Sequence, residues 1–191
     1  TTTFASAIGG SFALDTVALG AASTTVFNST VAAATLDMAA TSKVTLNAKA
    51  TLGGEFTSVT GTTITLGSAF VDGTTAIETA GDSTLNFSGH TITVNLSNQF
   101  TTGTVTLLDN NATLATADAT AFNVTDTALV DYSLDRGTAG TANFGLLITA
   151  NKRTAAGTAS YLGMSSSQTA ALGQVSAAVA SNDSTALAAI D

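Results

Sequence analysis

Few side chains in this sequence could act as catalytic acids, bases or nucleophiles. His90 is the only histidine, and the chain has no cysteine. A serine–histidine–acid triad or a histidine-based metal site therefore has one candidate residue, and thiolate chemistry has none. His90 opens an expected strand after Gly89, where we expect a turn or surface role. The motifs of nucleophile elbows, dinucleotide folds, P-loops and zinc proteases are absent from the sequence.

Carboxylates are scattered rather than paired. Two carboxylates can hydrolyse a glycosidic bond, but sugars also need aromatic platforms, and the chain has no tryptophan. Most of these side chains stand beside Gly, Asn or Thr, as solvated turn residues do. We therefore expect no enzyme activity, and a solenoid hydrolase would have to use Asp131 or Asp135. The carboxylates considered are Asp15, Asp37, Glu55, Asp72, Glu78, Asp82, Asp109, Asp118, Asp126, Asp131 and Asp135.

Specific binding sites are equally sparse. The oxygens of Asp109-Asn-Asn111 could bind calcium, although a turn is the simpler interpretation, and Gly9–Asp15 fails the GGxGxD calcium repeat. Flat rows of Thr-x-Thr suggest ice binding as a function. Their irregular spacing in the sequence argues against it, and threonine is common in ordinary strands. We expect no metal and no cofactor. The Thr-x-Thr pairs begin at Thr63, Thr91 and Thr104.

Asparagine occurs in two further contexts. Asn-x-Ser/Thr acceptors matter only where the host glycosylates them. Asn182-Asp183 could be a release site because an asparagine side chain can attack its own backbone; the simpler reading is a helix cap. The acceptor asparagines are Asn28, Asn86, Asn95, Asn111, Asn123 and Asn182.

Composition excludes several partners. Only 9% of the 191 residues are charged, and the net charge is −8. Five basic residues cannot form a phosphate-binding stripe, so we expect no nucleic acid. The longest strongly apolar run, 144–148, is far shorter than the roughly 20 residues of a membrane span. The chain starts at Thr1 without a signal-peptide pattern, which predicts a processed piece of a larger precursor.

Short alternations of apolar and polar residues must build the scaffold. Period-two patterns rich in β-branched residues predict half-buried strands, and short strands with few hairpin signals favour a stacked solenoid. The sequence thus predicts an all-β fold followed by a helical C-terminal tail. The expected β architecture is a right-handed parallel β-helix, and the alternative is an antiparallel β-sandwich. The expected strands are 12–14, 17–19, 25–27, 35–38, 44–46, 50–52, 55–59, 63–66, 69–71, 85–87, 92–96, 105–108, 121–124, 129–134 and 143–150.

The stretch 43–67 illustrates the pattern, with Gly53-Gly54 and Gly61 expected at corners. Its inward-facing residues are expected to be Val44, Leu46, Leu52, Phe56, Ile64 and Leu66.

We divide the chain into a β-solenoid over residues 1–150 and a helical linker or tail over 151–191. Ser165 and Gln168 form a capping-box pattern that predicts a helix start. Ser181–Ser184 could cap a second helix.

The chain resembles the C-terminal end of an autotransporter (type V secretion) passenger. The texture of TTTFASAIGGSFALDT and LNAKATLGGEFTSVTGTTITLGSAFV is similar to surface antigens of rickettsia-like bacteria. LVDYSLDRGTAGTANFGLLITANKR, followed by an Ala/Ser/Gln-rich helix, looks like the last passenger strands before the linker.

The resemblance implies a passenger displayed at the cell surface, anchored by a C-terminal membrane β-barrel in the precursor. It also implies that residues 100–150 form a C-terminal folding nucleus. The core of that nucleus would be Val105, Leu107, Phe122, Leu129, Tyr132, Leu134, Phe144, Leu146 and Ile148.

Two functions are therefore expected. The first is an exported structural or adhesive protein of the bacterial outer membrane and cell surface, with copies of itself or a host-cell receptor as partners. The low content of charged residues favours close lateral packing of neighbouring copies, as in a surface layer or filament. The alternative is a secreted β-sandwich subunit of a filament or surface layer assembled by strand exchange, with Phe4–Leu19 as the donated strand.

Overall fold

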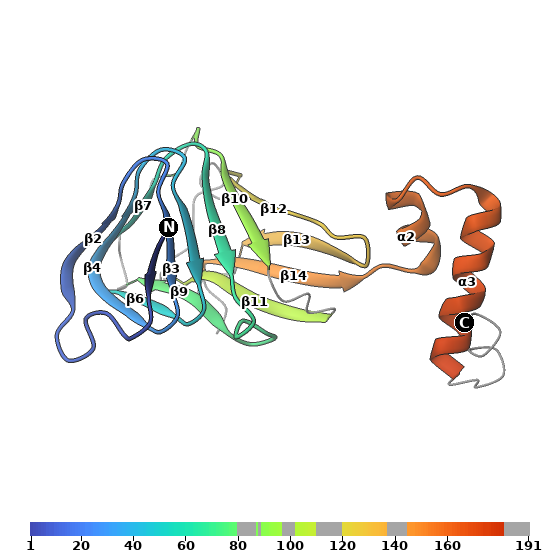
Figure 1. The fold of residues 1–191 in the computed structure, drawn as a ribbon, viewed down its shortest axis with the longest axis horizontal. Coiled ribbons are helices and arrows are strands. Elements are labelled where there is room, and N and C mark those ends of the chain that lie inside the picture. Colours follow the sequence, from blue (N-terminus) through green and yellow to red (C-terminus); the bar gives the residue numbers. More distant parts are fainter. Residues whose placement is uncertain (80–86, 88, 97–101, 110–119, 137–144, 182–191) are drawn as a thin grey trace. The chain divides into compact units, whose positions relative to one another are not determined.

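The computed structural model describes residues 1–79, 87, 89–96, 102–109, 120–136 and 145–181. It is mostly β-structure with a helical C-terminal segment, as expected (Figure 1). The chain divides into two compact units. The first comprises Thr1–Thr125 and Tyr132–Ala150, and the second Asp126–Asp131 and Asn151–Asp191. Residues 126–131, which the sequence analysis assigned to the solenoid, thus group with the C-terminal segment.

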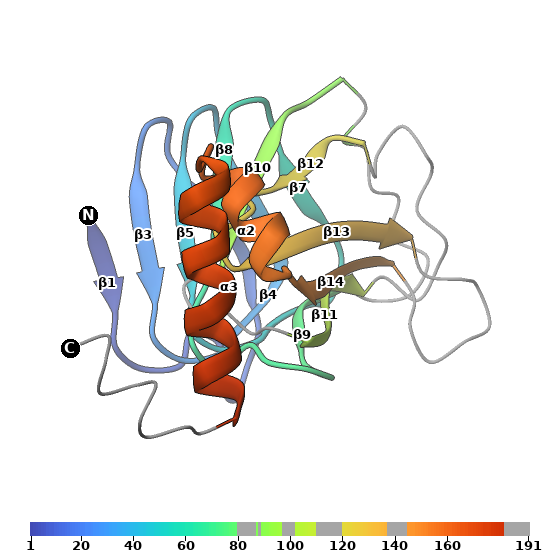
Figure 2. The ribbon, with the colours of Figure 1, turned by 90° about the vertical axis from the view of Figure 1, so that its right-hand side faces the viewer.

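Strands alternate between two sheets as the chain advances. Sheet A has six strands, and Figure 2 shows several of them side by side. Every neighbouring pair in sheet A runs parallel. In spatial order the strands are β1 (Thr2–Phe4), β3 (Thr24–Phe27), β5 (Lys43–Leu46), β8 (Thr62–Leu66), β10 (Ile92–Leu96) and β12 (Phe122–Val124).

Sheet B takes the intervening strands. Its pairs from β2 to β11 are also parallel. β4 pairs first with β6 and then with β7, and Gly53-Gly54 lies between these two short strands. The predicted corner is therefore a break between two strands that pair with the same neighbour. The order is β2 (Leu14–Leu19), β4 (Val31–Met38), β6 (Ala50–Leu52), β9 (Thr75–Thr79), β11 (Thr102–Asp109), β14 (Leu146–Lys152) and β13 (Val130–Arg136), with β7 (Phe56–Ser58) beside β4.

The parallel registers overturn the antiparallel β-sandwich. In a sandwich of hairpins, sequential strands would pair with each other in opposite directions. Here each strand up to β12 has its parallel partner in the next turn of the chain, about 20 to 30 residues away, as in Thr25↔Val44 and Ile64↔Val94. The donated-strand segment also pairs within its own chain, through β1 to β3 and β2 to β4.

The direction changes at the last strands of sheet B. Gly145 lies against the carbonyl of Leu108, and the hydroxyls of Thr104 and Thr149 are 3.5 Å apart. Residue numbers thus rise along β14 while they fall along β11, so these neighbours run antiparallel. β13 and β14 form a hairpin that completes the C-terminal end of the sheet.

Inward-facing side chains form columns through successive strands. Phe27, Leu46 and Leu66 occupy one column, because Phe27 pairs with Leu46 and Leu46 with Leu66. All six residues of 43–67 that were predicted to face inward are buried. Gly61 has a positive φ of 85°, which suits its predicted corner.

Several predictions beyond residue 67 were only partly correct. Residues 69–71 are not a strand; Phe70 is nevertheless buried, and the next strand is β9. Leu129 is 56% exposed, so its assignment to the core was wrong. Exposed and buried residues alternate here, with Val130 and Tyr132 buried, and Leu129 falls on the exposed side of that alternation. Phe144 lies outside the described residues, and Leu134 is half-buried. The confirmed core residues of the predicted nucleus are Val105, Leu107, Phe122, Tyr132, Leu146 and Ile148.

The second unit contains α2 (Ala155–Tyr161) and α3 (Ser166–Ser181). Thr154 caps α2 by accepting a hydrogen bond from the amide of Gly157. Ser165 and Gln168 form the predicted capping box before α3: the Ser165 amide donates to Gln168 at 2.9 Å. Neither described helix combines the length and hydropathy that a membrane crossing requires. The expected cap at Ser181–Ser184 extends beyond the described residues.

Candidate functional site

The outer face of sheet A presents two columns of mostly uncharged polar side chains, which we call the threonine face. It exists because alternate residues of each strand point inward, and parallel register places the remaining ones above each other. One column is Thr24, Lys43, Thr63, Thr93 and Asn123, and the other is Thr3, Val26, Thr45, Thr65 and Asn95.

The register changes the interpretation of the Thr-x-Thr pairs. Thr63 and Thr93 are neighbours across β8 and β10 although 30 residues separate them in the sequence, so irregular sequence spacing does not prevent alignment. Lys43 nevertheless interrupts the first column, and Val26 interrupts the second. The third pair, at Thr104, lies on β11 in the other sheet. The threonine face is thus suited to broad, weak contact with an uncharged surface rather than to a regular lattice.

An asparagine pair lies where the chain leaves sheet A. The side-chain Nδ2 of Asn47 donates to the side-chain Oδ1 of Asn28 at 2.8 Å. One turn of the chain further on, the equivalent position is Gly67. Its backbone amide donates to the Leu46 carbonyl, just as the Asn47 backbone amide donates to the Phe27 carbonyl. A side chain at Gly67 would stand 1.9 Å from the Asn47 amide oxygen. Asn28 is therefore bonded in the structure, although its side chain remains exposed.

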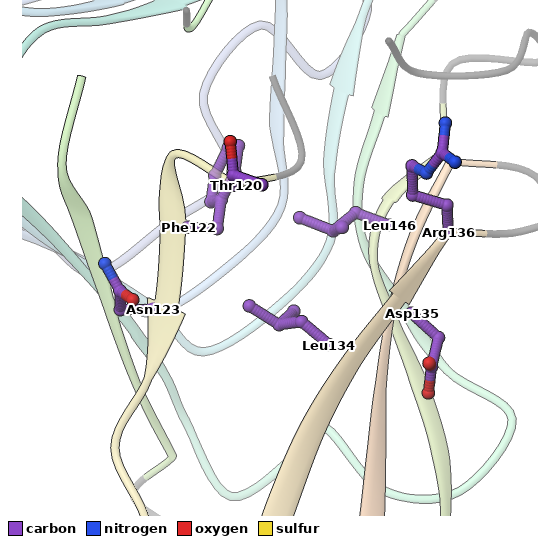
Figure 3. A pocket seen from close by; sticks show the side chains of 7 residues that line it. All are labelled: Thr120, Phe122, Asn123, Leu134, Asp135, Arg136 and Leu146. Atoms are coloured by element: carbon purple, nitrogen blue, oxygen red, sulfur yellow. The ribbon is translucent and has the colours of Figure 1, made fainter. Parts of the chain in front are cut away.

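A pocket of about 480 Å³ lies at the C-terminal end of the first unit, between β12 and the β13–β14 hairpin (Figure 3). Leu134 and Leu146 project into it, while Asp135 and Arg136 point away from these leucines (Figure 3). Phe122 lines the opposite wall. The lining also includes the polar residues Thr120 and Asn123, and the acidic and basic side chains do not converge on one point. The pocket is thus mixed in polarity, and its charged side chains are not placed together for acid–base chemistry.

Several carboxylates have defined structural partners. Asp37 accepts a hydrogen bond from the Thr57 hydroxyl at 2.7 Å, on neighbouring strands. Asp72 accepts from the Thr104 amide at 2.7 Å. Glu78 pairs with Lys49 at 2.6 Å, with both side chains roughly half exposed.

Of the remaining carboxylates, Asp109 on β11 is the register partner of Glu78 on the neighbouring strand β9. Asp15 and Glu55 are exposed, Asp109 ends β11, and Ser133 donates to Asp135 at 3.3 Å. Asp82 and Asp118 lie outside the described residues. Across the described ranges, no three histidine, aspartate or glutamate side chains are grouped so that they could share a metal ion.

Arg153 forms a polar cluster in the described part of the second unit, which we call the Arg153 cluster. Its guanidinium contacts Asp126 at 2.9 Å and Asp131 at 3.2 Å, and it lies over the Tyr161 ring at 4.8 Å from the centroid. Nε also donates to the carbonyl of Thr127. Asp126 and Asp131 thus share one arginine and hold the 126–131 segment against the start of α2.

Sequence reasoning noticed Asp126 and Asp131 but did not connect them with Arg153, which is 27 and 22 residues away. Arg153 could have been singled out because the chain has only five basic residues and this one precedes a helix cap.

His90 follows Gly89, which has a positive φ of 77°, and its amide donates to the carbonyl of Phe87. The structure therefore places it in the expected turn. Among the described groups, its Nδ1 has no hydrogen-bond partner and no solvent exposure. One buried ring nitrogen does not by itself form a catalytic constellation.

Several predicted sites lie partly or wholly outside the described residues. Of the calcium candidate, only Asp109 is described; Asn110 and Asn111 are not. The Asn182-Asp183 release site is also outside. Among glycosylation acceptors, Asn28 and Asn123 are exposed and Asn95 is half-buried, whereas Asn86, Asn111 and Asn182 lie outside.

Comparison with known proteins found no matching family model, no matching curated protein and no matching solved structure.

Proposed function

We propose that the chain is a passenger segment of an autotransporter, exported across the outer membrane of a bacterium and displayed as a structural or adhesive surface protein. Its fold in this proposal is a right-handed parallel β-helix. Its partners are neighbouring copies or a host-cell receptor, and a C-terminal membrane β-barrel in the precursor anchors it.

The observation that carries the proposal is the alternation of short parallel strands between two sheets. From β1 to β12, each turn of the chain adds one strand to sheet A and then extends sheet B, by one strand or, after β5, by the two short strands β6 and β7. Such a unit cannot bury its own apolar side chains, and its core forms only when turns stack. A stack of such turns suits a protein that presents a repeated surface rather than one that encloses a reaction.

The surface chemistry also supports display. The threonine face carries Lys43 as its single charged side chain, and the whole chain has 9% charged residues. Uncharged hydroxyl surfaces can approach each other or a host glycan without the repulsion that a net charge of −8 concentrated on one face would cause.

The order of elements at the C-terminal end fits the proposed passenger junction. The β13–β14 hairpin follows the parallel strands, and α2 and α3 follow the hairpin. Tyr132, Leu146 and Ile148 give the hairpin a buried face. A hairpin is a local structure that can form before long-range parallel pairs, so it is suited to begin folding during export.

Protease accessibility on intact cells tests the proposal. In the source bacterium, added proteinase K should remove the epitopes of an antibody raised against residues 1–79, while a periplasmic protein remains intact. Removal of these epitopes only after the outer membrane has been permeabilised would contradict the proposal.

A further inference from the structure

The turn before β9 contains the only Asp-Gly pair in the sequence, Asp72-Gly73. The backbone after an aspartate can rearrange when the next amide nitrogen attacks the side-chain carboxyl. A following glycine hinders this attack least, because it has no Cβ and tolerates many backbone conformations. Both residues are exposed, and a Cβ added at Gly73 would meet open space. By sequence and exposure, this is therefore a reactive pair.

The turn itself is closed by hydrogen bonds between Val71 and Thr74. The Thr74 amide donates to the Val71 carbonyl at 3.1 Å, and the Val71 amide donates to the Thr74 hydroxyl at 3.0 Å. Gly73 has a positive φ of 77°, which glycine adopts without strain. These local contacts fix the path of the turn but do not engage the two groups that would react.

Thr104, the third residue of β11, engages both reacting groups through its backbone. Its amide donates to Oδ1 of Asp72 at 2.7 Å, and its carbonyl accepts from the Gly73 amide at 2.8 Å. The electrophile and the nucleophile of the rearrangement are thus held by one residue of a neighbouring strand.

Gly103 completes this arrangement, which we call the Thr104 clamp and which consists of Asp72, Gly73, Gly103 and Thr104. The Asp72 carboxyl lies directly against the Gly103 backbone, since any Cβ at Gly103 would overlap it. The nearby register pair of Thr75 with Thr106 belongs to the ladder between β9 and β11. The clamp is therefore continuous with that ladder and is lost when the two strands separate.

We propose that Asp72-Gly73 is a self-modification site that the Thr104 clamp keeps closed. In the open turn, the Gly73 nitrogen attacks Cγ of the protonated Asp72 side chain. The new N–Cγ bond closes a five-membered succinimide, and the amide proton leaves with the carboxyl hydroxyl as water. A water molecule then cleaves one of the two carbonyl C–N bonds of the ring. One cleavage restores aspartate, and the other gives isoaspartate, whose main chain runs through Cγ.

The clamp opposes ring closure at both reacting groups. The Gly73 N–H points at the Thr104 carbonyl, so the nitrogen must break that bond before it can lose its proton to the reaction. The Thr104 amide holds the Asp72 carboxyl against Gly103, which restricts its rotation. Isoaspartate adds one carbon to the main chain, so the product cannot repeat the contacts with Thr104. Isoaspartate at this position therefore indicates that β9 and β11 have separated.

The inference does not rest on the proposed function, and its test uses the purified chain. Enzymatic methylation of isoaspartyl groups, followed by peptide mapping, measures isoaspartate at Asp72. At neutral pH it should form in the folded chain more slowly, by roughly tenfold or more, than in a synthetic peptide of residues 69–76, because opening paired strands costs free energy. Formation at the rate of the peptide would overturn the proposal.

Hydrogen exchange of the Gly73 amide links the reaction to opening of the clamp. The ratio of isomerisation rates in the folded chain and the peptide should equal the open fraction that Gly73 exchange reports. Both quantities should rise together as urea is increased below the unfolding midpoint. Isomerisation that exceeds the open fraction, or that stays constant while Gly73 exchange accelerates, would show that the clamp does not control the site.

Two substitutions in β11 form a matched pair. Gly103→Ala places a methyl group against the Asp72 carboxyl and should accelerate isoaspartate formation. Thr104→Val removes the hydroxyl but keeps the backbone amide and carbonyl of the clamp, so it should retain the wild-type rate. A folded Gly103→Ala chain with the wild-type rate, or a faster Thr104→Val chain with unchanged Gly73 exchange, would contradict the proposal. If Gly103→Ala does not fold, the urea series on the wild-type chain decides.

Discussion

At the scale of single residues, Asn47 determines what the next turn of the chain can carry. Its side chain bonds to Asn28 on one side, and on the other it fills the space beside Gly67. Any side chain at Gly67 would also meet the carbonyl of Leu46, at 3.0 Å from its Cβ. The asparagine pair therefore ends at a glycine for steric reasons rather than for backbone flexibility.

Gly67→Ala should lower the free energy of unfolding by about 1–3 kcal/mol, because an overpacked site must shift its neighbours. Combining it with Asn47→Ala should cost less than the sum of the two single changes, since truncation of Asn47 makes room for the new methyl group. Urea denaturation of the four proteins measures this coupling. Gly20→Ala, which has open space around the new Cβ, is the control. Additive costs would show that Asn47 does not restrict Gly67.

The buried phenylalanines illustrate a second effect at this scale. Phe56 and Phe87 lie 5.5 Å apart, and Phe87 and Phe122 lie 5.0 Å apart, between ring centroids. Phe56 and Phe122, at the two ends of this row, are 66 residues apart in the sequence. The row therefore exists only when the turns have stacked.

Phe56→Ala should reduce the free energy of unfolding by about 3–5 kcal/mol, because it leaves a cavity in this row. Phe12→Ala removes the same side chain from a site that is 87% exposed, and in dilute solution should change stability by less than about 0.5 kcal/mol. Thermal or urea unfolding at low protein concentration compares the two. Similar losses for both variants would contradict the burial of Phe56 in a stacked core.

At the scale of elements, the Arg153 cluster connects the 126–131 segment to α2 within the second unit. Arg153 donates its backbone amide to Leu129, and the Tyr161 hydroxyl donates to the carbonyl of Asp126. The Arg153 side chain is 17% exposed, so its ion pairs with Asp126 and Asp131 are less screened by water than a surface pair.

Arg153→Ala should therefore weaken the attachment of α2, with a loss of about 2 kcal/mol from charged hydrogen bonds. Hydrogen exchange of the amides in 157–162 should accelerate, while exchange in β3 and β5 stays unchanged. Arg153→Lys keeps the charge but cannot contact both carboxylates and the Tyr161 ring in the same geometry, so it should restore only part of the protection. Full protection in Arg153→Ala would show that α2 is held by other contacts.

How much of these elements the sequence predicts depends on the range of the contacts. Period two locates β5, β6 and β10 almost to the residue, since the inward side chains such as Val44, Leu52 and Val94 are strongly apolar. It misses β9, because Thr75–Thr79 has little apolar alternation, and it misses α2, whose residues are small and polar.

The candidate surfaces were less predictable still. Alignment of Thr63 with Thr93, and of Arg153 with Asp126 and Asp131, depends on how many residues each connection contains. That length is visible in the sequence, but its effect on register is not.

At the scale of the whole molecule, the proposed function depends on one arrangement of the first unit. In that arrangement each turn of the chain moves the strands of sheet A one step along a common direction. Display of a surface built from repeated turns and a core formed by stacking both follow from it. The central claim is thus the parallel, in-register order of sheet A.

Spin-label distances in sheet A test this claim most directly, and the absence of native cysteine makes the labelling specific. Thr24 and Asn123 occupy the same column four strand steps apart, through Lys43, Thr63 and Thr93. At about 4.8 Å per step, their backbones should be about 19 Å apart, and Thr24 and Thr93 about 14 Å apart. Electron spin resonance on the Thr24→Cys/Asn123→Cys and Thr24→Cys/Thr93→Cys pairs should show narrow distributions that differ by about one strand step. Broad distributions, or a Thr24–Asn123 distance no longer than that of Thr24–Thr93, would contradict the parallel stack.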